Sequence, residues 1–516
     1  MANLRREFSL FLLLVSIFLG GVVRIYPALN RSFAMNDGGL FYSMVEDLHA
    51  NHFSLPFFAS YNGGNIPFVY PPLGLYLTGA LARLGFEPIA LFQWLPGILS
   101  ALSIPAFYGF ARILLKDELQ AGLAGLFYAM LPTGLMWQIM GGGVTRAPGL
   151  IFVLLTFSSL AILYQSGQVR WVLPGAVFAS FMALSHPEMT YQSLFTILYF
   201  FLFWRSKRAF AHSLAIGGLT LLLTSPWWLT VLLRHGLEPF RAALGAHPTG
   251  AGGLTGLFYI VQFNLTGEPL TTVIASLGML GILAAIRRKD FFLVGWLLIS
   301  MLTDARAAPL FSGFPLTMLA AQGLDMLFSR ALLPEIPFWP KNWFALGVIS
   351  VLTAYLFLSA LMAVAQQANL NTLTKADLQT LAWVKQNIPK ESRFLVLTGR
   401  YALADPLSEW FPALTESYSL ATVQGSEWSS TRGLAESIWR YHQLQDCLQQ
   451  DPACLYAWSA DFSYVYISRA KVNEAGEVVS NISPLEVLLR HSTEFVILRE
   501  SPDAILFKKS GLVFVK

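Results

Sequence analysis

A single carboxylate, Asp37, lies in the stretch FAMNDGGLFYSMVEDL, which covers positions 33–48. It follows the first apolar segment of the chain, just beyond the point where that segment ends. The apolar residues after it recur at helical spacing, so Asn36 or Asp37 is well placed to cap the N-terminus of a short helix. The same carboxylate is also suited to remove a proton from a hydroxyl group as a general base. This stretch alone leaves both roles open.

Further ionisable side chains gather in turns that are predicted on the same side of the molecule. They are Arg146, His186, Glu188, Asp304 and Arg306. Ionisable groups near lipid are costly and are often functional. The two arginines, Arg146 and Arg306, are candidate ligands for an anionic phosphate group. Tyr70, His186 and Glu188 are candidate substrate-binding residues.

Each of these ionisable residues also has a purely structural interpretation. Arg146 follows a triple glycine and would mark the start of a helix. His186 would satisfy a backbone group at a proline break. Glu188 suits the first turn of a helix, and Arg306 suits an interface anchor or a partner for Asp304. The individual residues do not decide between structure and function.

The composition places these residues in a polytopic α-helical membrane protein. The 516 residues are 55% hydrophobic and 12% charged, with a mean hydropathy of +0.55, whereas soluble domains average about 25% charged residues. About eleven segments are apolar enough for spanning helices. They are 8–27, 88–114, 121–140, 147–164, 171–185, 189–204, 209–232, 268–286, 291–303, 309–328 and 343–365. No A-x-A cleavage site follows the first segment, so we expect it to be retained rather than removed as a signal peptide.

The basic residues predict the orientation of the chain in the plasma membrane. The RSKR and RRK clusters and most other Lys and Arg residues of the loops fall on the cytoplasmic side if the N-terminus is cytoplasmic. An odd number of spans then places the C-terminal part outside. We expect a transmembrane domain at 1–365, whose first outer loop is 28–87, and an extracytoplasmic domain at 366–516. No basic block indicates nucleic-acid binding.

The first outer loop is long, and long loops that do not span the membrane are often functional. The apolar spacing after Asp37 predicts an amphipathic helix that lies in the outer membrane interface. Tyr70 precedes a double proline, which predicts the start of a second short helix. Together these two helices indicate a platform rather than a linker.

The C-terminal part has the sequence pattern of a small α/β domain. An amphipathic helix is expected from about residue 375, with Leu378, Leu381, Ala382 and Val384 on its apolar side. Strands are expected at 393–399, 462–468, 494–500, 504–509 and 511–516. No nucleotide-binding or hydrolase motif is present. Cys447 and Cys454 are either bridged or free thiols, and the sequence leaves this open.

At these residues the sequence resembles the GT-C class of membrane glycosyltransferases. This class includes protein O-mannosyltransferases, lipid A aminoarabinose transferases and oligosaccharyltransferase catalytic subunits. The shared pattern is a first helix that ends before an acidic motif, a YPPL motif, several spans and an exterior α/β domain. The stretches LAWVKQNIPKESRFLVLTG and EWFPALT (409–415) look like that domain in uncharacterised prokaryotic members. The resemblance covers the whole chain, although many members have an Asp-Glu pair where Asp37 is followed by Gly38.

The resemblance implies a glycosyltransferase of the cell envelope that uses a polyprenyl-phosphate sugar donor. By this resemblance Asp37 matches the catalytic aspartate of the first loop, and Arg306 looks like the arginine that holds the donor phosphate. The acceptor would be a glycan, a lipid or a protein, and the displacement would invert the anomeric carbon. No cofactor is assigned. A divalent cation, Mg²⁺ or Mn²⁺, stays open, although the 141–146 turn lacks the acidic residue of the oligosaccharyltransferase metal site and Asp37 with Glu188 would offer only a weak oxygen site.

Two other functions compete with this interpretation. A secondary transporter would place its substrate near the membrane midplane, often between repeated halves, and neither a repeat nor a midplane charge cluster is present. A non-catalytic membrane scaffold derived from the same fold is the second alternative, and the missing Asp-Glu pair keeps it open. Lipid-linked sugar bound below Asp37 would separate the enzyme from the scaffold, and vesicle uptake would test the transporter.

Overall fold

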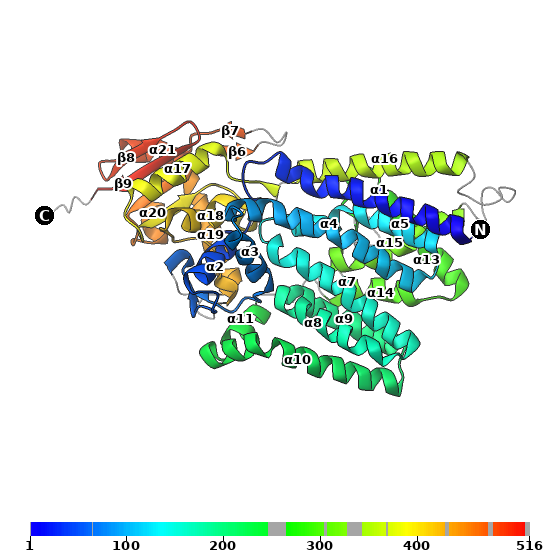
Figure 1. The fold of residues 1–516 in the computed structure, drawn as a ribbon. Coiled ribbons are helices and arrows are strands. Elements are labelled where there is room, and N and C mark those ends of the chain that lie inside the picture. The colour runs from blue at the N-terminus through cyan, green and yellow to red at the C-terminus, as the bar shows by residue number, and fades with distance from the viewer. Residues whose placement is uncertain are drawn as a thin grey trace.

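The structure, a computed structural model, describes residues 2–63, 66–245, 265–303, 307–327, 343–367, 370–428, 433–472 and 478–510. A bundle of long helices forms one end of the molecule and an α/β region forms the other (Figure 1). The N-terminus lies at the end of the bundle that is distant from the α/β region. The first loop of the chain lies where the two parts meet, so this junction is where the candidate residues have to be sought.

Every segment that was predicted to span the membrane contains at least one helix. The helices are α1 Ala2–Leu29, α4 Pro88–Leu115, α5 Glu118–Met130, α6 Pro132–Leu135, α7 Gly143–Ser166, α8 Val172–Ser185, α9 Pro187–Phe203, α10 Lys207–His235, α13 Val273–Arg288, α14 Phe292–Thr303, α15 Ala308–Met326 and α16 Trp343–Gln366. Within the described ranges, five helices are long and apolar enough to cross a membrane, and a sixth results if the pair bent by 73° at Pro132 crosses as one. The chain is therefore a membrane protein, whereas the count of eleven spans stays a prediction.

One arginine lies inside the bundle. Arg24 of α1 is fully buried, and its guanidinium donates hydrogen bonds to the carbonyl oxygen of Ala129 at 2.6 Å and to the hydroxyl of Ser100 at 3.1 Å. A buried charge is costly unless hydrogen bonds satisfy it. These contacts therefore tie α1 to α4 and α5 at one fixed register.

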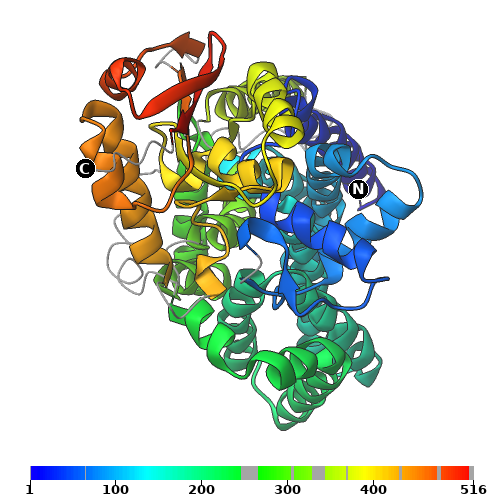
Figure 2. The ribbon, with the colours of Figure 1, turned by 90° about the vertical axis from the view of Figure 1, so that its left-hand side faces the viewer.

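The two short helices predicted in the first loop are present as α2 Gly39–Ala50 and α3 Leu73–Arg83. The apolar residues Leu40, Met44 and Leu48 of α2 are buried, and α2 packs against α3 and against α18 (Pro406–Thr415) of the α/β region. We expected this face of α2 to lie in the membrane interface, but protein covers it instead. Figure 2 looks from the α/β side and shows the blue first-loop helices beside the yellow elements of that region.

The α/β region contains a five-stranded sheet with the order β4-β3-β5-β9-β8. Strand β3 is parallel to β4 and β5, whereas β9 is antiparallel to β5 and β8. The strands are β3 Arg393–Leu397, β4 Tyr418–Ser419, β5 Tyr464–Ser468, β8 Phe495–Glu500 and β9 Ala504–Lys509, and a separate hairpin is formed by β6 Ala470–Val472 and β7 Val478–Ser480. Four of the five predicted strands are thus confirmed, and the fifth, at 511–516, lies outside the described residues.

Helices cover this sheet and join it to the bundle. They are α17 Lys375–Asn387, α18 Pro406–Thr415, α19 Gly433–Asp446, α20 Ala453–Trp458 and α21 Pro484–His491. The expected helix is confirmed as α17, which begins at a capping box of Thr374 and Asp377 and buries Leu381 and Val384. A disulfide joins Cys447 and Cys454, between α19 and α20, which resolves the choice that the sequence left open.

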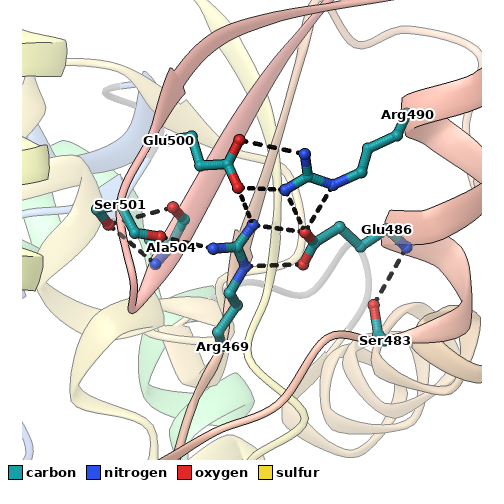
Figure 3. A network of polar contacts seen from close by, with 7 residues as sticks. All are labelled: Arg469, Ser483, Glu486, Arg490, Glu500, Ser501 and Ala504. Atoms are coloured by element: carbon teal, nitrogen blue, oxygen red, sulfur yellow. Dashed lines mark hydrogen bonds and ion pairs between the residues drawn. The ribbon is translucent and has the colours of Figure 1, made fainter.

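An ionic network fixes α21 against the edge strand β8 (Figure 3). Glu486 is fully buried and accepts hydrogen bonds from Arg469 and Arg490, each with a contact of 2.9 Å. Glu500 of β8 binds both arginines from the other side. Since a buried charge needs partners to be tolerated, the network specifies one position for α21.

Candidate active site

A cavity of about 200 Å³ lies where the first loop, the starts of α7 and α9, and the α/β region meet. The predicted site residues that line it are Asp37, Tyr70, Arg146, His186 and Glu188. These residues come from four separate stretches of sequence, and the fold brings them to one place. Arg306 lies outside the described residues, so its predicted role stays a prediction.

The carboxylate of Asp37 is held by the start of α7. The backbone N–H of Gly142 donates to Oδ1 at 2.9 Å, and the guanidinium of Arg146 forms an ion pair with Oδ2. A Cβ atom on Gly141 would lie 2.0 Å from the carbonyl oxygen of Asp37, and one on Gly142 would lie 2.7 Å from Oδ2. The glycines before α7 are therefore needed for this close approach, which a helix start alone does not require.

Neither Asn36 nor Asp37 caps α2, so the capping hypothesis was wrong. The backbone N–H groups of Gly38 and Leu40 donate instead to Oε1 of Glu409, both at 3.2 Å. Asn36 and Gly38 have positive φ values of 52° and 127°, which turn the chain sharply on both sides of Asp37. The cap of α2 thus comes from the α/β region, and Asp37 is free to face the cavity.

Tyr70 and His186 form the wall of the cavity beside α7 and α9. The hydroxyl group of Tyr70 is hydrogen-bonded to Thr145 Oγ1 at 3.2 Å, and the two aromatic rings of Tyr70 and His186 lie edge to face at 6.1 Å. Burial raises the pKa of Tyr70 above its ordinary value, so the phenol is neutral at pH 7. Glu188 lies in the first turn of α9, as expected, and it also lines the cavity.

The α/β region also lines the cavity, and the sequence analysis missed its contribution, which includes Glu409, Glu427 and Trp428. Glu409 is only 4% exposed. Burial, followed by the negative charge of Asp37, raises the pKa of Glu409 to about 8. A glutamate on the short, mostly apolar helix α18 was the available signal, but only the fold shows that this helix meets the first loop.

A second cavity, of about 230 Å³, lies on the bundle side of Arg146. Arg146, Trp137 and Glu188 line both cavities. The guanidinium of Arg146 donates to the carbonyl oxygen of Trp137 at 3.0 Å and lies 5.4 Å from the centre of its ring. Ala307, the residue after Arg306, also lines this second cavity. The side chain of Arg146 thus lies between the first cavity, which Asp37 lines, and the second cavity, which lies on the side of the bundle.

The described residues around this cavity do not form a set of ligands that fits a divalent metal ion. Within the part of the chain that the structure describes, no three His, Cys, Asp or Glu side chains are grouped as metal ligands. Both carboxylate oxygens of Asp37 already have protein partners. We therefore derive no step through a metal ion.

Comparison with known proteins defines the class of fold. No protein-family model matches the chain, and none of the curated proteins compared with it is similar in sequence. The chain nevertheless has a GT-C-like fold, because its structure aligns over most of its length with solved GT-C glycosyltransferases.

Three solved structures illustrate this likeness. The archaeal oligosaccharyltransferase AglB from Archaeoglobus fulgidus, in complex with an inhibitory peptide and a dolichol-phosphate, has a TM-score of 0.58 at 14% identity over 92% of this chain and 74% of its own. ArnT from Cupriavidus metallidurans, bound to undecaprenyl phosphate, has 0.55 at 13% identity over 97% and 98%. Arabinofuranosyltransferase AftD from Mycobacteria has 0.57 at 13% identity over 98% and 40%. Identities this low establish the fold alone.

Proposed function

We propose that this chain is a membrane glycosyltransferase that moves a sugar from a polyprenyl-phosphate donor to an acceptor at the outer face of the membrane. The observation that carries the proposal is the position of Asp37. In a chain with a GT-C-like fold, its carboxylate lines one cavity and is paired with an arginine that also lines a second cavity. Two structural neighbours were solved with polyprenyl phosphates, which supports a ligand of this kind.

The two cavities suit the two substrates. The second cavity is bounded mostly by bundle residues, including Pro132, Met189 and Leu310, which suits a lipid-linked donor that arrives from the bilayer. The first cavity lies against the α/β region and contains several carboxyl and aromatic groups, which suits a polar acceptor. We assign the donor phosphate to the second cavity and the acceptor hydroxyl to the first.

In the proposed reaction, Asp37 accepts the proton of the acceptor hydroxyl as the oxygen attacks the anomeric carbon. The bond between that carbon and the phosphate oxygen breaks, and its electron pair leaves with the polyprenyl phosphate. A new glycosidic bond forms on the opposite face, so the configuration inverts. The phosphate is a stable anion, and the step therefore requires no strong general acid.

Arg146 links the two halves of this reaction. Its guanidinium pairs with Asp37, and the same side chain borders the cavity that we assign to the phosphate. A phosphate oxygen is a strong acceptor for a guanidinium. A bound donor would therefore compete with Asp37 for Arg146 and leave Asp37 able to receive the proton of the acceptor.

The test uses the full chain in nanodiscs with synthetic polyprenyl-phosphate hexoses and pentoses and a membrane extract as the source of acceptor. Mass spectrometry measures the released polyprenyl phosphate. We expect Asp37→Asn to lower release by about 10²–10⁴-fold. The matched control is Asp117→Asn, at the opposite end of the bundle where Asp117 pairs with Arg5, and it should behave as the parent chain.

Three outcomes would contradict the proposal. Normal release by Asp37→Asn would exclude the base role. Binding of the donors without release by the parent chain would favour the scaffold. Accumulation of an intact sugar inside proteoliposomes would favour the transporter.

A further inference from the structure

The carboxyl group of Glu409 is placed against the backbone that follows Asp37. It belongs to α18 and is buried, and its Oε1 atom accepts the N–H groups of both Gly38 and Leu40 at 3.2 Å. Its other oxygen, Oε2, is buried and has no hydrogen-bond partner among the described residues. Glu409 also lines the first cavity. One oxygen of Glu409 thus binds the backbone, while the other has no hydrogen-bond partner in the part of the chain that the structure describes.

The contact between α18 and the first loop extends to the backbone. Trp410 donates its indole N–H to the carbonyl oxygen of Asn36 at 3.1 Å, and the hydroxyl of Tyr61 donates to the carbonyl oxygen of Glu409 at 2.6 Å. A Cβ atom on Gly39 would lie 2.4 Å from that same carbonyl oxygen. The close approach of α18 therefore explains why the second glycine of the NDGG stretch, Gly39, is needed. Residues on both sides of Asp37 are held by this one helix.

We propose that Glu409 is a positioning residue for the transfer at Asp37: its carboxyl group fixes the backbone from Gly38 to Leu40 and thereby the direction of the Asp37 carboxylate. The inference rests on the proposed function, because it assigns Glu409 a part in the same reaction. It goes beyond that function by making a side chain of the α/β region necessary for the geometry of a base in the first loop.

The charges around Glu409 favour its neutral form. The carboxylates of Asp37 and Glu427 face it and oppose ionisation, whereas the cation of Arg146 is taken up by Asp37. Glu188, His186 and Tyr70 line the same cavity, and the phenol of Tyr61 donates to the backbone of Glu409 rather than to its carboxyl group.

The pH dependence of the reaction follows from these charges. Burial and Asp37 raise the pKa of Glu409 to about 8, so the group is a neutral acid at pH 7 and ionises as the pH rises through 8. The ionised form places a second negative charge beside the carboxylate of Asp37. The repulsion between the two carboxylates would move Asp37 from its observed position, and transfer should therefore fall at alkaline pH.

Two substitutions distinguish the effect of the hydrogen-bond acceptor of Glu409 from the effect of its negative charge. In Glu409→Gln, the amide oxygen can still accept both N–H groups and no proton is lost at alkaline pH. We expect transfer within about threefold of the parent chain at pH 7, without the decline of up to about tenfold per pH unit that the parent chain shows above pH 8. Glu409→Ala removes the acceptor, and we expect kcat to fall about 10- to 100-fold with a smaller change in KM for the donor.

A second measurement does not depend on turnover. Hydrogen exchange of the peptide that contains Gly38 and Leu40 should be faster in Glu409→Ala than in the parent chain and unchanged in Glu409→Gln. The control is Glu416→Gln at the end of the same helix, where the carboxylate pairs with Lys385 and Lys390 outside the cavity. It should change neither the exchange nor the pH profile.

The results separate this inference from the proposed function. An unchanged exchange rate in Glu409→Ala, or an alkaline decline that persists in Glu409→Gln, would overturn the positioning role while leaving Asp37 as the base. Absence of transfer by the parent chain at every pH would instead overturn the proposed function and, with it, the role of Glu409 in that reaction.

Discussion

The most direct test of the geometry at Asp37 is the substitution Gly142→Ala, which adds a single methyl group. This residue has φ −63° and ψ −7°, values that alanine adopts without strain. The backbone therefore tolerates the substitution, and its effect comes from contacts alone. The new Cβ atom would lie 2.7 Å from Oδ2 of Asp37 and 2.9 Å from Nη2 of Arg146.

The expected magnitude follows from these distances. Ordinary carbon contacts begin near about 3.5 Å, so the carboxylate or the guanidinium must move by roughly 0.8 Å. A displacement of about 1 Å at a reacting group costs about 10²-fold in rate. We therefore expect Gly142→Ala to lower the release of polyprenyl phosphate by about 10- to 10²-fold. Because the methyl group overpacks a buried site, we expect a loss of about 1–3 kcal/mol in the free energy of unfolding.

The matched control is Gly109→Ala in α4, where a Cβ atom would meet no atom within 4 Å. Alanine is a better helix former than glycine by about 0.5–1 kcal/mol, so this variant should be as active as the parent chain and slightly more stable. Activity is measured in nanodiscs at saturating donor, and folding is checked by the thermal midpoint of the detergent-solubilised protein. A folded Gly142→Ala variant with the parent rate would refute the argument that the observed position of Asp37 is the reactive one.

Two further predictions concern the charged partners. Arg146→Ala should weaken the use of the donor more than Arg146→Lys does, because lysine keeps the charge but not the two-pronged contact of a guanidinium; equal KM values for the donor in the two variants would argue against a phosphate contact. Glu486→Ala should destabilise the α/β region by about 3–5 kcal/mol, because it leaves buried Arg469 without its main partner. Glu500→Ala, whose carboxylate is more exposed, should change the thermal midpoint far less, and equal shifts would contradict this account.

Much of the fold was predictable because hydrophobic periodicity is a local property. Apolar runs of spanning length and the alternating patterns of strands depend only on residues that are close together in the sequence. Each predicted helix and most predicted strands accordingly appear in the structure. Strand β4 was missed because it has only two residues, which is too short for a pattern. The hairpin of β6 and β7 was missed for the same reason, since each of its strands has three residues.

The site was only partly predictable because its decisive contacts join distant parts of the chain. Asp37 and Arg146 could be singled out from the cost of charge near lipid, and the structure pairs them. The triple glycine before Arg146 was interpreted as the mark of a helix start, whereas the close approach of Asp37 is what requires Gly141 and Gly142. Glu409 is separated from Gly38 by 371 residues. The residues next to Glu409 in the sequence therefore do not indicate which helix it caps.

The loop that holds Asp37 is formed by both parts of the molecule, and Asn36 shows why. Its backbone N–H donates to Asn371 at 2.7 Å, its side-chain amide donates to Leu403 at 3.1 Å, and its carbonyl oxygen accepts from Trp410 at 3.1 Å. A non-glycine residue with positive φ costs about 1–3 kcal/mol and persists only where its surroundings hold it.

All three of these partners of Asn36 follow α16, on the α/β side, while the carboxylate of Asp37 is held from α7 in the bundle. Neither part supplies both sets of contacts. The observed position of Asp37 should therefore exist only when the bundle and the α/β region are docked against each other.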